Sequence, residues 1–167
     1  DSDIRRGWPT INKIWKNKLS ILVGDYLFSK SLTNISNFND LNCVKILSDI
    51  SERLSEGEIM QIEKAINKNM TEKEYFKMIS DKTASLISAS CYLGLYSTNQ
   101  DKKLCNTIKD FGEYLGIAYQ IKDDLFDIIG NINNTGKKSN LDLKKNMLTL
   151  PYIHALSNLD NRLKKVF

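Results

Sequence analysis

Histidine, proline and cysteine are scarce in this sequence, which has one His, two Pro and three Cys in 167 residues. The single histidine, His154, lies in an amphipathic stretch, which argues against a His-rich zinc site and a Ser-His-Asp triad. The cysteines form no CxxC pair and sit in apolar helical patterns, so we expect reduced core thiols in a cytoplasmic protein. No apolar run approaches the ~20 residues that span a bilayer, and the charged start predicts no signal peptide.

The charge of the chain is nearly balanced, with 24 basic residues, 20 acidic residues and a net charge of +4. The basic residues are dispersed, whereas nucleic-acid binding needs a basic cluster on one face. A mild positive excess suits an anionic small molecule instead. Apolar residues make up 41% of the chain, enough for a hydrophobic core, so we expect residues 1–167 to form one domain.

Apolar residues recur with a helical period along most of the chain, with no strand alternation and no internal repeat. The predicted helices cover residues 11–32, 40–65 and 71–96, a segment from the N-cap Asn99 to 129, and a last helix that begins near Pro151. Thr71 and Glu74 form a capping box at the start of the third helix. The pattern predicts an all-α helical bundle. We expect it to be incomplete at both ends, since the chain opens like the tail of a loop and Phe167 closes a helix without a stop signal.

Three aspartates lie close together on the fourth predicted helix. Gln120, Asp123, Asp124 and Asp127 are offset by three, four and seven residues, which puts their side chains on one face. Three carboxylates in two turns repel one another, and a divalent cation would relieve that repulsion. Mg²⁺ prefers oxygen ligands and typically combines one or two carboxylates with substrate phosphates. The alternative is a solvated helix face that binds no metal.

The same helix carries an apolar stripe that includes Leu104, Phe111 and Leu115. Gly116 and Gly112 lie one and two turns before Gln120, on the row of the carboxylates. We expect these small residues to leave room beside the carboxylates.

Basic residues in three other segments would suit a phosphate held by that cation. Arg5 and Arg6 precede Gly7 in a predicted turn and offer two guanidinium groups. Lys82 lies in the apolar third helix, where a buried ammonium needs an anionic partner. Lys137 follows in a polar loop after the carboxylate helix. Each alone is an ordinary surface charge, but together with the aspartates they favour a diphosphate site.

Six motifs of this chain, in this order, resemble the trans-isoprenyl diphosphate synthases, with bacterial polyprenyl synthases of the octaprenyl type as the most similar group. The motifs are Arg5-Arg6-Gly7, Gly24-Asp25-Tyr26-Leu27, Gly57-Glu58-Ile59-Met60-Gln61, Lys82-Thr83-Ala84, Asp123-Asp124-Leu125-Phe126-Asp127 and Thr149-Leu150-Pro151. The fifth resembles the family's second aspartate-rich motif, preceded by Gln120. The resemblance covers nearly the whole chain.

The resemblance implies a Mg²⁺-dependent prenyl transfer. In this family, Mg²⁺ assists departure of the diphosphate of an allylic substrate, the double bond of isopentenyl diphosphate attacks the resulting cation, and proton loss completes the extension. By resemblance, Asp123, Asp124 and Asp127 ligate the metal. The family also implies a homodimer.

The remaining roles follow from the same resemblance. The residues implied to bind the allylic diphosphate are Arg5, Lys82 and Lys137. Arg6 is implied to bind isopentenyl diphosphate. Thr83 and Gln120 are implied to place oxygen dipoles near the developing cation and, with Lys82, form the catalytic group. Asp25, Glu58 and Gln61 have a supporting role or a purely structural one.

One part of the family pattern is missing, because the first aspartate-rich motif would end just before Asp1. Two explanations remain open: a piece of a complete synthase, and a naturally short, non-catalytic subunit that regulates an active synthase. A third reading is a structural helical domain whose carboxylates are solvated. Residues upstream of Asp1 would largely set product length, so the sequence does not predict it.

Overall fold

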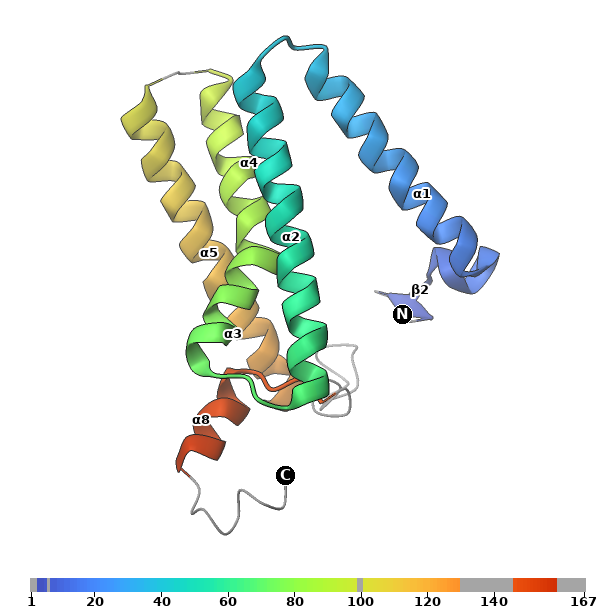
Figure 1. Ribbon diagram of the computed structural model, residues 1–167, viewed down its shortest axis with the longest axis vertical. Coiled ribbons are helices and arrows are strands. Elements are labelled where there is room, and N and C mark those ends of the chain that lie inside the picture. The colour runs from blue at the N-terminus through green and yellow to red at the C-terminus, as the bar shows by residue number, and fades with distance from the viewer. Residues whose placement is uncertain (1–2, 6, 99–100, 130–145, 159–167) are drawn as a thin grey trace. The chain divides into compact units, whose positions relative to one another are not determined.

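The computed structural model describes residues 3–5, 7–98, 101–129 and 146–158, and the described chain is almost entirely helical (Figure 1). The all-α prediction is confirmed. The fold divides into two compact units, Asp1–Ser48 and Asp49–Phe167. The prediction of a single domain stays a prediction.

The first unit begins with a hairpin of two very short strands, β1 (Ile4–Arg5) and β2 (Trp8–Pro9). Gly7 turns the chain between them with φ of 82°, a conformation that costs glycine little. We expected no strand here, and strands of two residues are too short to show alternation. Gly7, the last residue of the predicted turn, therefore lies between the two strands of a β-hairpin.

Two long helices follow, α1 (Ile11–Ser36) and α2 (Leu41–Asn67), both predicted to within four residues of their ends. Helix α1 is kinked at Trp15 and Lys16, where Lys16 has φ of 66°. The Asp40 side chain accepts a hydrogen bond from the Asn42 N–H at 2.9 Å, which fixes the start of α2.

The third predicted helix is in fact three segments: α3 (Glu72–Ile79), the π-helical turn η1 (Ser80–Ala84) and α4 (Ser85–Tyr96). The predicted capping box of Thr71 and Glu74 is confirmed, with both reciprocal hydrogen bonds present. Hydrogen bonds from Lys64 and then Thr71 lower the pKa of Glu74 to about 2. The π turn was not predicted, because the segments on either side of it each keep a helical period and only the phase between them changes.

Helix α5 (Lys102–Ile129) packs closely against η1 and α4. The predicted N-cap, Asn99, lies outside the described residues, and the Asp101 side chain accepts from the N–H groups of Lys103 and Leu104. We expected Gly112 and Gly116 to leave room beside the carboxylates, but the structure shows no such space at either glycine. A Cβ on Gly116 would lie 2.5 Å from Ala84 Cα, because the backbone of the neighbouring turn fills that space.

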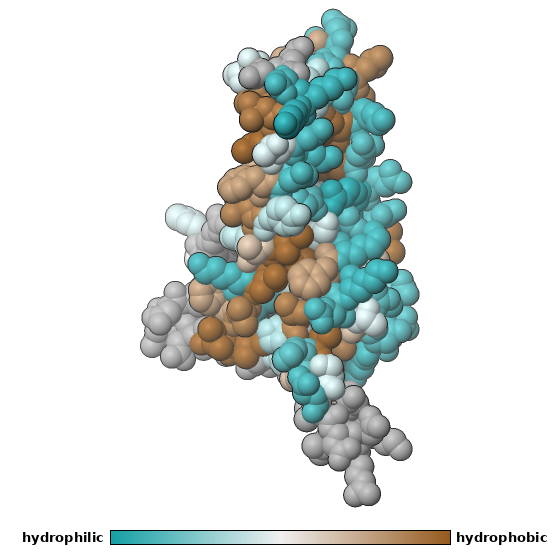
Figure 2. Space-filling view, turned by 90° about the vertical axis from the view of Figure 1, so that its left-hand side faces the viewer, coloured by the Kyte–Doolittle hydropathy of each residue, from teal (hydrophilic) through white to brown (hydrophobic). Residues whose placement is uncertain are grey.

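The apolar stripe of α5 is exposed in the structure. Leu104, Phe111 and Leu115 are 47%, 55% and 48% exposed, whereas Gly112 and Asp124 on the opposite side are buried. Figure 2, which looks at the side of the second unit that carries α5, shows a continuous hydrophobic column beside a hydrophilic surface. The close contacts of α5 are thus made by its small and acidic row.

The core of the second unit is a cluster of Met70, Tyr75, Met78 and Ile79. Helix α8 (Leu150–Asn158) packs against α3 and α5, and it begins near Pro151 as predicted. None of the described helices combines the length and apolar character needed to cross a membrane.

Candidate functional site

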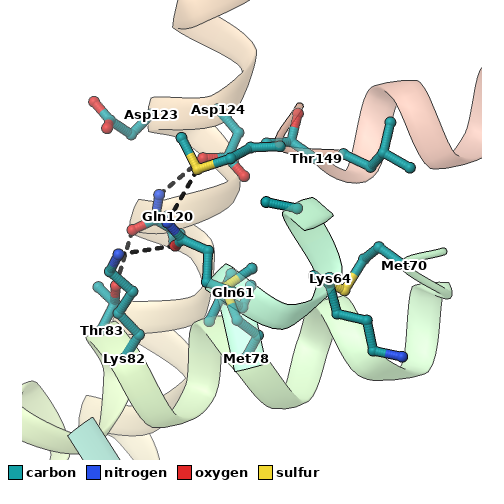
Figure 3. A pocket seen from close by; sticks show the side chains of 14 residues that line it. Gln61, Lys64, Met70, Met78, Lys82, Thr83, Gln120, Asp123, Asp124 and Thr149 are labelled. Carbon is teal, nitrogen blue, oxygen red and sulfur yellow. Dashed lines mark hydrogen bonds between the residues drawn. The ribbon is translucent and has the colours of Figure 1, made fainter. Parts of the chain in front are cut away.

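The carboxylate row of α5 borders a cavity of about 160 Å³ in the second unit (Figure 3). Its walls come from α2, α3, η1, α5 and the segment before α8. Six residues that were given a role from the sequence line it: Gln61, Lys82, Thr83, Gln120, Asp123 and Asp124. Much of the remaining lining is apolar and includes three methionines. The helices thus bring the implied catalytic group and two of the three implied metal ligands to one place.

The ammonium of Lys82 contacts two side chains of α2. Its Nζ lies 2.6 Å from Glu58 Oε2 and donates to Gln61 Oε1 at 2.8 Å. The Lys82 side chain is 34% exposed, so its charge reaches the cavity without being fully desolvated. The expectation of an anionic partner for Lys82 is met by Glu58, within the same unit.

Close backbone contact between α2 and η1 makes this pairing possible. A Cβ on Gly57 would lie 2.7 Å from the Lys82 backbone N, so only glycine fits without a shift. Gln61, one turn further along α2, also donates to Met147 Sδ at 3.0 Å. Glu58 and Gln61 thus both contact the Lys82 ammonium. Asp25, in contrast, is exposed on α1 in the other unit.

A chain of hydrogen bonds crosses the cavity from η1 to α3. The Thr83 hydroxyl donates to Gln120 Oε1 at 2.9 Å, and Gln120 Nε2 donates to Asp124 Oδ1 at 2.8 Å. The hydroxyl of the fully buried Tyr75 donates to Asp124 Oδ2 at 2.6 Å. Because Gln120 uses its amide N–H toward Asp124, its oxygen is oriented toward Thr83 (Figure 3).

Asp124 is a buried carboxyl in a crowded acidic environment. Burial raises its pKa, hydrogen bonds from Tyr75 and Gln120 oppose that rise, and the charges of Asp123 and Asp127 add to it. The net pKa lies above the ordinary aspartate value. This electrostatic strain is what a cation beside the row would relieve.

The donor chemistry of the row fits Mg²⁺ as part of a shared site. Over the described ranges, no cluster of three or more His, Cys, Asp or Glu side chains is arranged to hold a metal by itself. Mg²⁺ commonly takes one or two protein carboxylates and fills its other positions with water and phosphate oxygens. Asp123 and Asp124 both border the cavity and supply such oxygens. The assignment of Asp123, Asp124 and Asp127 as ligands stays a prediction.

Three of the predicted diphosphate contacts are not placed by the structure. Arg6 and Lys137 lie outside the described residues, and only the backbone of Arg5 is described, in β1. Of the four predicted cations, Lys82 alone has a described position in the cavity wall.

Tyr75 is the residue at this site that sequence reasoning missed. It lies 49 positions before Asp124, in a stretch that reads only as an amphipathic helix. The available signal was the tyrosine itself, because a phenol that packs into a helical core usually finds a hydrogen-bond partner.

Comparison with known proteins shows which family the chain belongs to. The family model described as polyprenyl synthetase matches residues 1–167, the whole chain. The chain belongs to the polyprenyl synthetase family. The resemblance read from the six motifs is thereby confirmed.

Individual relatives agree with the family model. The chain is 36% identical to heptaprenyl diphosphate synthase component 2 of Bacillus subtilis, over 99% of this chain and 48% of that protein. A decaprenyl diphosphate synthase structure from Rhodobacter capsulatus matches with a TM-score of 0.90 and 37% identity, covering 98% of this chain and 50% of that one. The Caulobacter crescentus polyprenyl synthase, complexed with calcium and isoprenyl diphosphate, matches with a TM-score of 0.89 and 30% identity, over 98% and 50%.

The chain spans about half the length of the relatives it matches. Their names specify products of different lengths, so the octaprenyl type stays a prediction.

Proposed function

We propose that the whole protein is a polyprenyl diphosphate synthase, which condenses an allylic diphosphate with isopentenyl diphosphate and releases diphosphate. The observation that carries this proposal is the convergence of Lys82, Thr83, Gln120, Asp123 and Asp124 on one cavity. An ammonium, two oxygen dipoles and two carboxylates suit a diphosphate and its departure better than they suit a hydrolytic triad.

The carboxylates would hold the cofactor. Asp123, Asp124 and Asp127 would bind Mg²⁺, which when bound would neutralise charge on the departing diphosphate. Supporting this, the Caulobacter crescentus relative was solved with a divalent cation and an isoprenyl diphosphate together. Tyr75 and Gln120 orient Asp124 and leave Asp123 as the other carboxylate at the cavity.

The other side chains would bind and orient the substrate. Lys82 would donate to the allylic diphosphate, with Arg5 and Lys137 as further contacts, and Arg6 would bind isopentenyl diphosphate. Thr83 and Gln120 present oxygen atoms whose dipoles would favour positive charge at the allylic carbon. The methionines Met70, Met78 and Met147 give the cavity an apolar lining that would keep water from this cation.

The test is prenyl transfer by the whole protein, supplied with Mg²⁺, an allylic diphosphate and isopentenyl diphosphate, and followed by product chromatography. Asp123→Asn should lower kcat by about a hundredfold or more, since a metal ligand is worth several kcal/mol in the transition state. Its free energy of unfolding should stay within about 0.5 kcal/mol of wild type. The matched control, Asp110→Asn, changes an exposed aspartate of the same helix and should leave kcat unchanged. A wild type that forms no prenyl product would contradict the proposal.

We further propose that the protein works as a homodimer in the cytoplasm. The three cysteines, all among the described residues, are thiols, which suits a reducing compartment. Sedimentation of the purified protein tests the assembly, and a monomer would contradict it.

A second candidate is a non-catalytic subunit that regulates an active synthase. The observation in its favour is the name of the Bacillus subtilis relative, which is one component of its synthase. Mixing the protein with an active synthase decides between them. A changed product length, together with no activity of the protein alone, would favour the subunit.

A further inference from the structure

Arg53 of α2 joins three helical segments through one guanidinium group. Its Nε donates to Asp81 Oδ1 at 2.8 Å. Its Nη2 donates to Ser80 Oγ and to Glu113 Oε1, each at 2.8 Å. Ser80 and Asp81 are the first two residues of η1, and Glu113 lies on α5.

The π turn held by Arg53 is the one that carries Lys82 and Thr83. Asp81 immediately precedes Lys82, so a contact that fixes Asp81 also fixes where the next two side chains point. Arg53, Gly57 and Gln61 are spaced by four residues and present one face of α2 to this turn. Arg53 holds its start, the Gly57 backbone meets Lys82, and Gln61 accepts from the Lys82 ammonium.

The two carboxylates that contact Arg53 are buried or half-buried. Asp81 and Glu113 have side chains 8% and 22% exposed, and Arg53 is 32% exposed. Lys77 Nζ lies 2.6 Å from Asp81 Oδ2 and 3.7 Å from the exposed Glu56, so Arg53 and Lys77 together face three carboxylates. Ser80 also donates to Glu113. A lysine at position 53 would keep the charge but lack the planar fork that serves three partners at once.

We propose that Arg53 is a positioning residue, which holds the π-helical turn so that Lys82 and Thr83 face the cavity. This inference rests on the proposed function for its catalytic consequence. A π turn accommodates one more residue than an α-helical turn and is rarely stable by itself. Relaxation of η1 to α-helical geometry would rotate Lys82 and Thr83 by about 100°, the rotation of one helical residue. Lys82 would then leave Glu58 and Gln61, and Thr83 would leave Gln120.

The experiment compares Arg53→Met with Ile50→Val in the whole protein. Arg53→Met removes the guanidinium and keeps a long side chain, whereas Ile50→Val trims a buried residue of the same helix and leaves the guanidinium in place. Positioning predicts that Arg53→Met lowers kcat by at least about a hundredfold, since a misplacement of only about 1 Å already costs that much. Ile50→Val should lower the melting temperature and leave kcat and KM unchanged.

A second readout does not depend on catalysis. Lysines are acetylated with an N-hydroxysuccinimide ester, and the modified fraction of each is measured by mass spectrometry. In Arg53→Met the labelling of Lys82 should rise severalfold, and Arg53→Lys should lie between it and wild type. Lys64, which is paired with Glu74 at 2.6 Å in the same unit, serves as the internal reference and should not change.

Each outcome decides the proposal. Lys82 labelling and kcat that both match Ile50→Val would overturn it and make Arg53 a purely structural ion-pair partner. If Arg53→Met does not fold, Glu113→Gln, which removes one acceptor and leaves the guanidinium, should raise Lys82 labelling more modestly, and no rise would again overturn it. A wild type without prenyl transfer would defeat the proposed function, while the labelling comparison would still decide the role of Arg53.

Discussion

The Nζ atom of Lys82 lies 2.6 Å from Oε2 of Glu58. The lysine implied to bind a diphosphate is therefore already paired with a carboxylate of its own chain. Glu58 is 51% exposed, so it can move into solvent when a stronger anion arrives. An incoming diphosphate would compete with Glu58 for the ammonium.

Glu58→Gln should therefore strengthen the binding of inorganic pyrophosphate. An exposed ion pair is worth about 0.2–1 kcal/mol, so the dissociation constant should fall by up to about fivefold at low salt. The gain should shrink as salt screens the charges. Calorimetric titration in the presence of Mg²⁺ measures it, with Glu56→Gln, an exposed carboxylate of the same helix, as the control. Weaker binding would show that Glu58 orients Lys82 for the ligand instead of competing with it.

Tyr75→Phe should destabilise the fold through Asp124. The change removes a 2.6 Å hydrogen bond to a buried carboxylate and adds no bulk. The free energy of unfolding should fall by about 1.5–3 kcal/mol, the usual range for a hydrogen bond to a charged group. Urea denaturation measures this, and Tyr114→Phe, at a tyrosine 73% exposed, should change it by less than about 0.5 kcal/mol. Equal effects of the two substitutions would contradict the role given to Tyr75.

The elements that the sequence predicted well are those whose signal is local. Apolar periodicity located the long helices, and the capping box at Thr71 depends on residues three positions apart. The meeting of Lys82 and Thr83 with Gln120 was implied by motif resemblance, since spacing alone joins only Gln120 to the aspartates.

The features that were missed depend on partners far along the chain. Arg53 contacts Asp81 and Glu113, 28 and 60 positions away, and nothing near Arg53 signals either contact. The roles of Gly112 and Gly116 were misread for the same reason. Their neighbours lie on η1 and α4. The π turn sets the rotation of α4 relative to α3, and this change of phase is not visible in the apolar period of either segment.

Gly116→Ala tests the close approach of α5 to the π turn. The new Cβ would lie 2.5 Å from Ala84 Cα, so α5 or η1 must shift. We expect the free energy of unfolding to fall by about 1–3 kcal/mol, as for other overpacked sites. Gly94→Ala is the matched control, since a Cβ there meets nothing within 4 Å. It should stabilise the helix by about 0.5–1 kcal/mol, and loss of stability at both sites would mean that helix context and not close packing is responsible.

The network around Arg53 should make the free energy of unfolding depend on pH in the acid range. Burial raises the pKa of Glu113, but hydrogen bonds from Arg53 and Ser80 outweigh this and hold it below the ordinary value of 4.5. The pKa of Asp81 is likewise lowered, because hydrogen bonds from Lys77 and Arg53 outweigh its burial. As the pH falls below 4.5, the unfolded chain takes up a proton at Glu113 before the folded chain does. Folding is then disfavoured, and this contribution to stability, complete above that pH, is lost on the way down through the lowered pKa.

Glu113→Gln should therefore flatten the acid side of the curve of unfolding free energy against pH. The variant is less stable than wild type at neutral pH, because it loses the ionic contact to Arg53. The difference between the two proteins should narrow as the pH falls. Urea denaturation at several pH values measures this, with Glu52→Gln, an exposed glutamate of α2, as the control for net charge. A difference that stays constant down to acid pH would show that Glu113 stabilises the fold by packing and not by its ionised contact with Arg53.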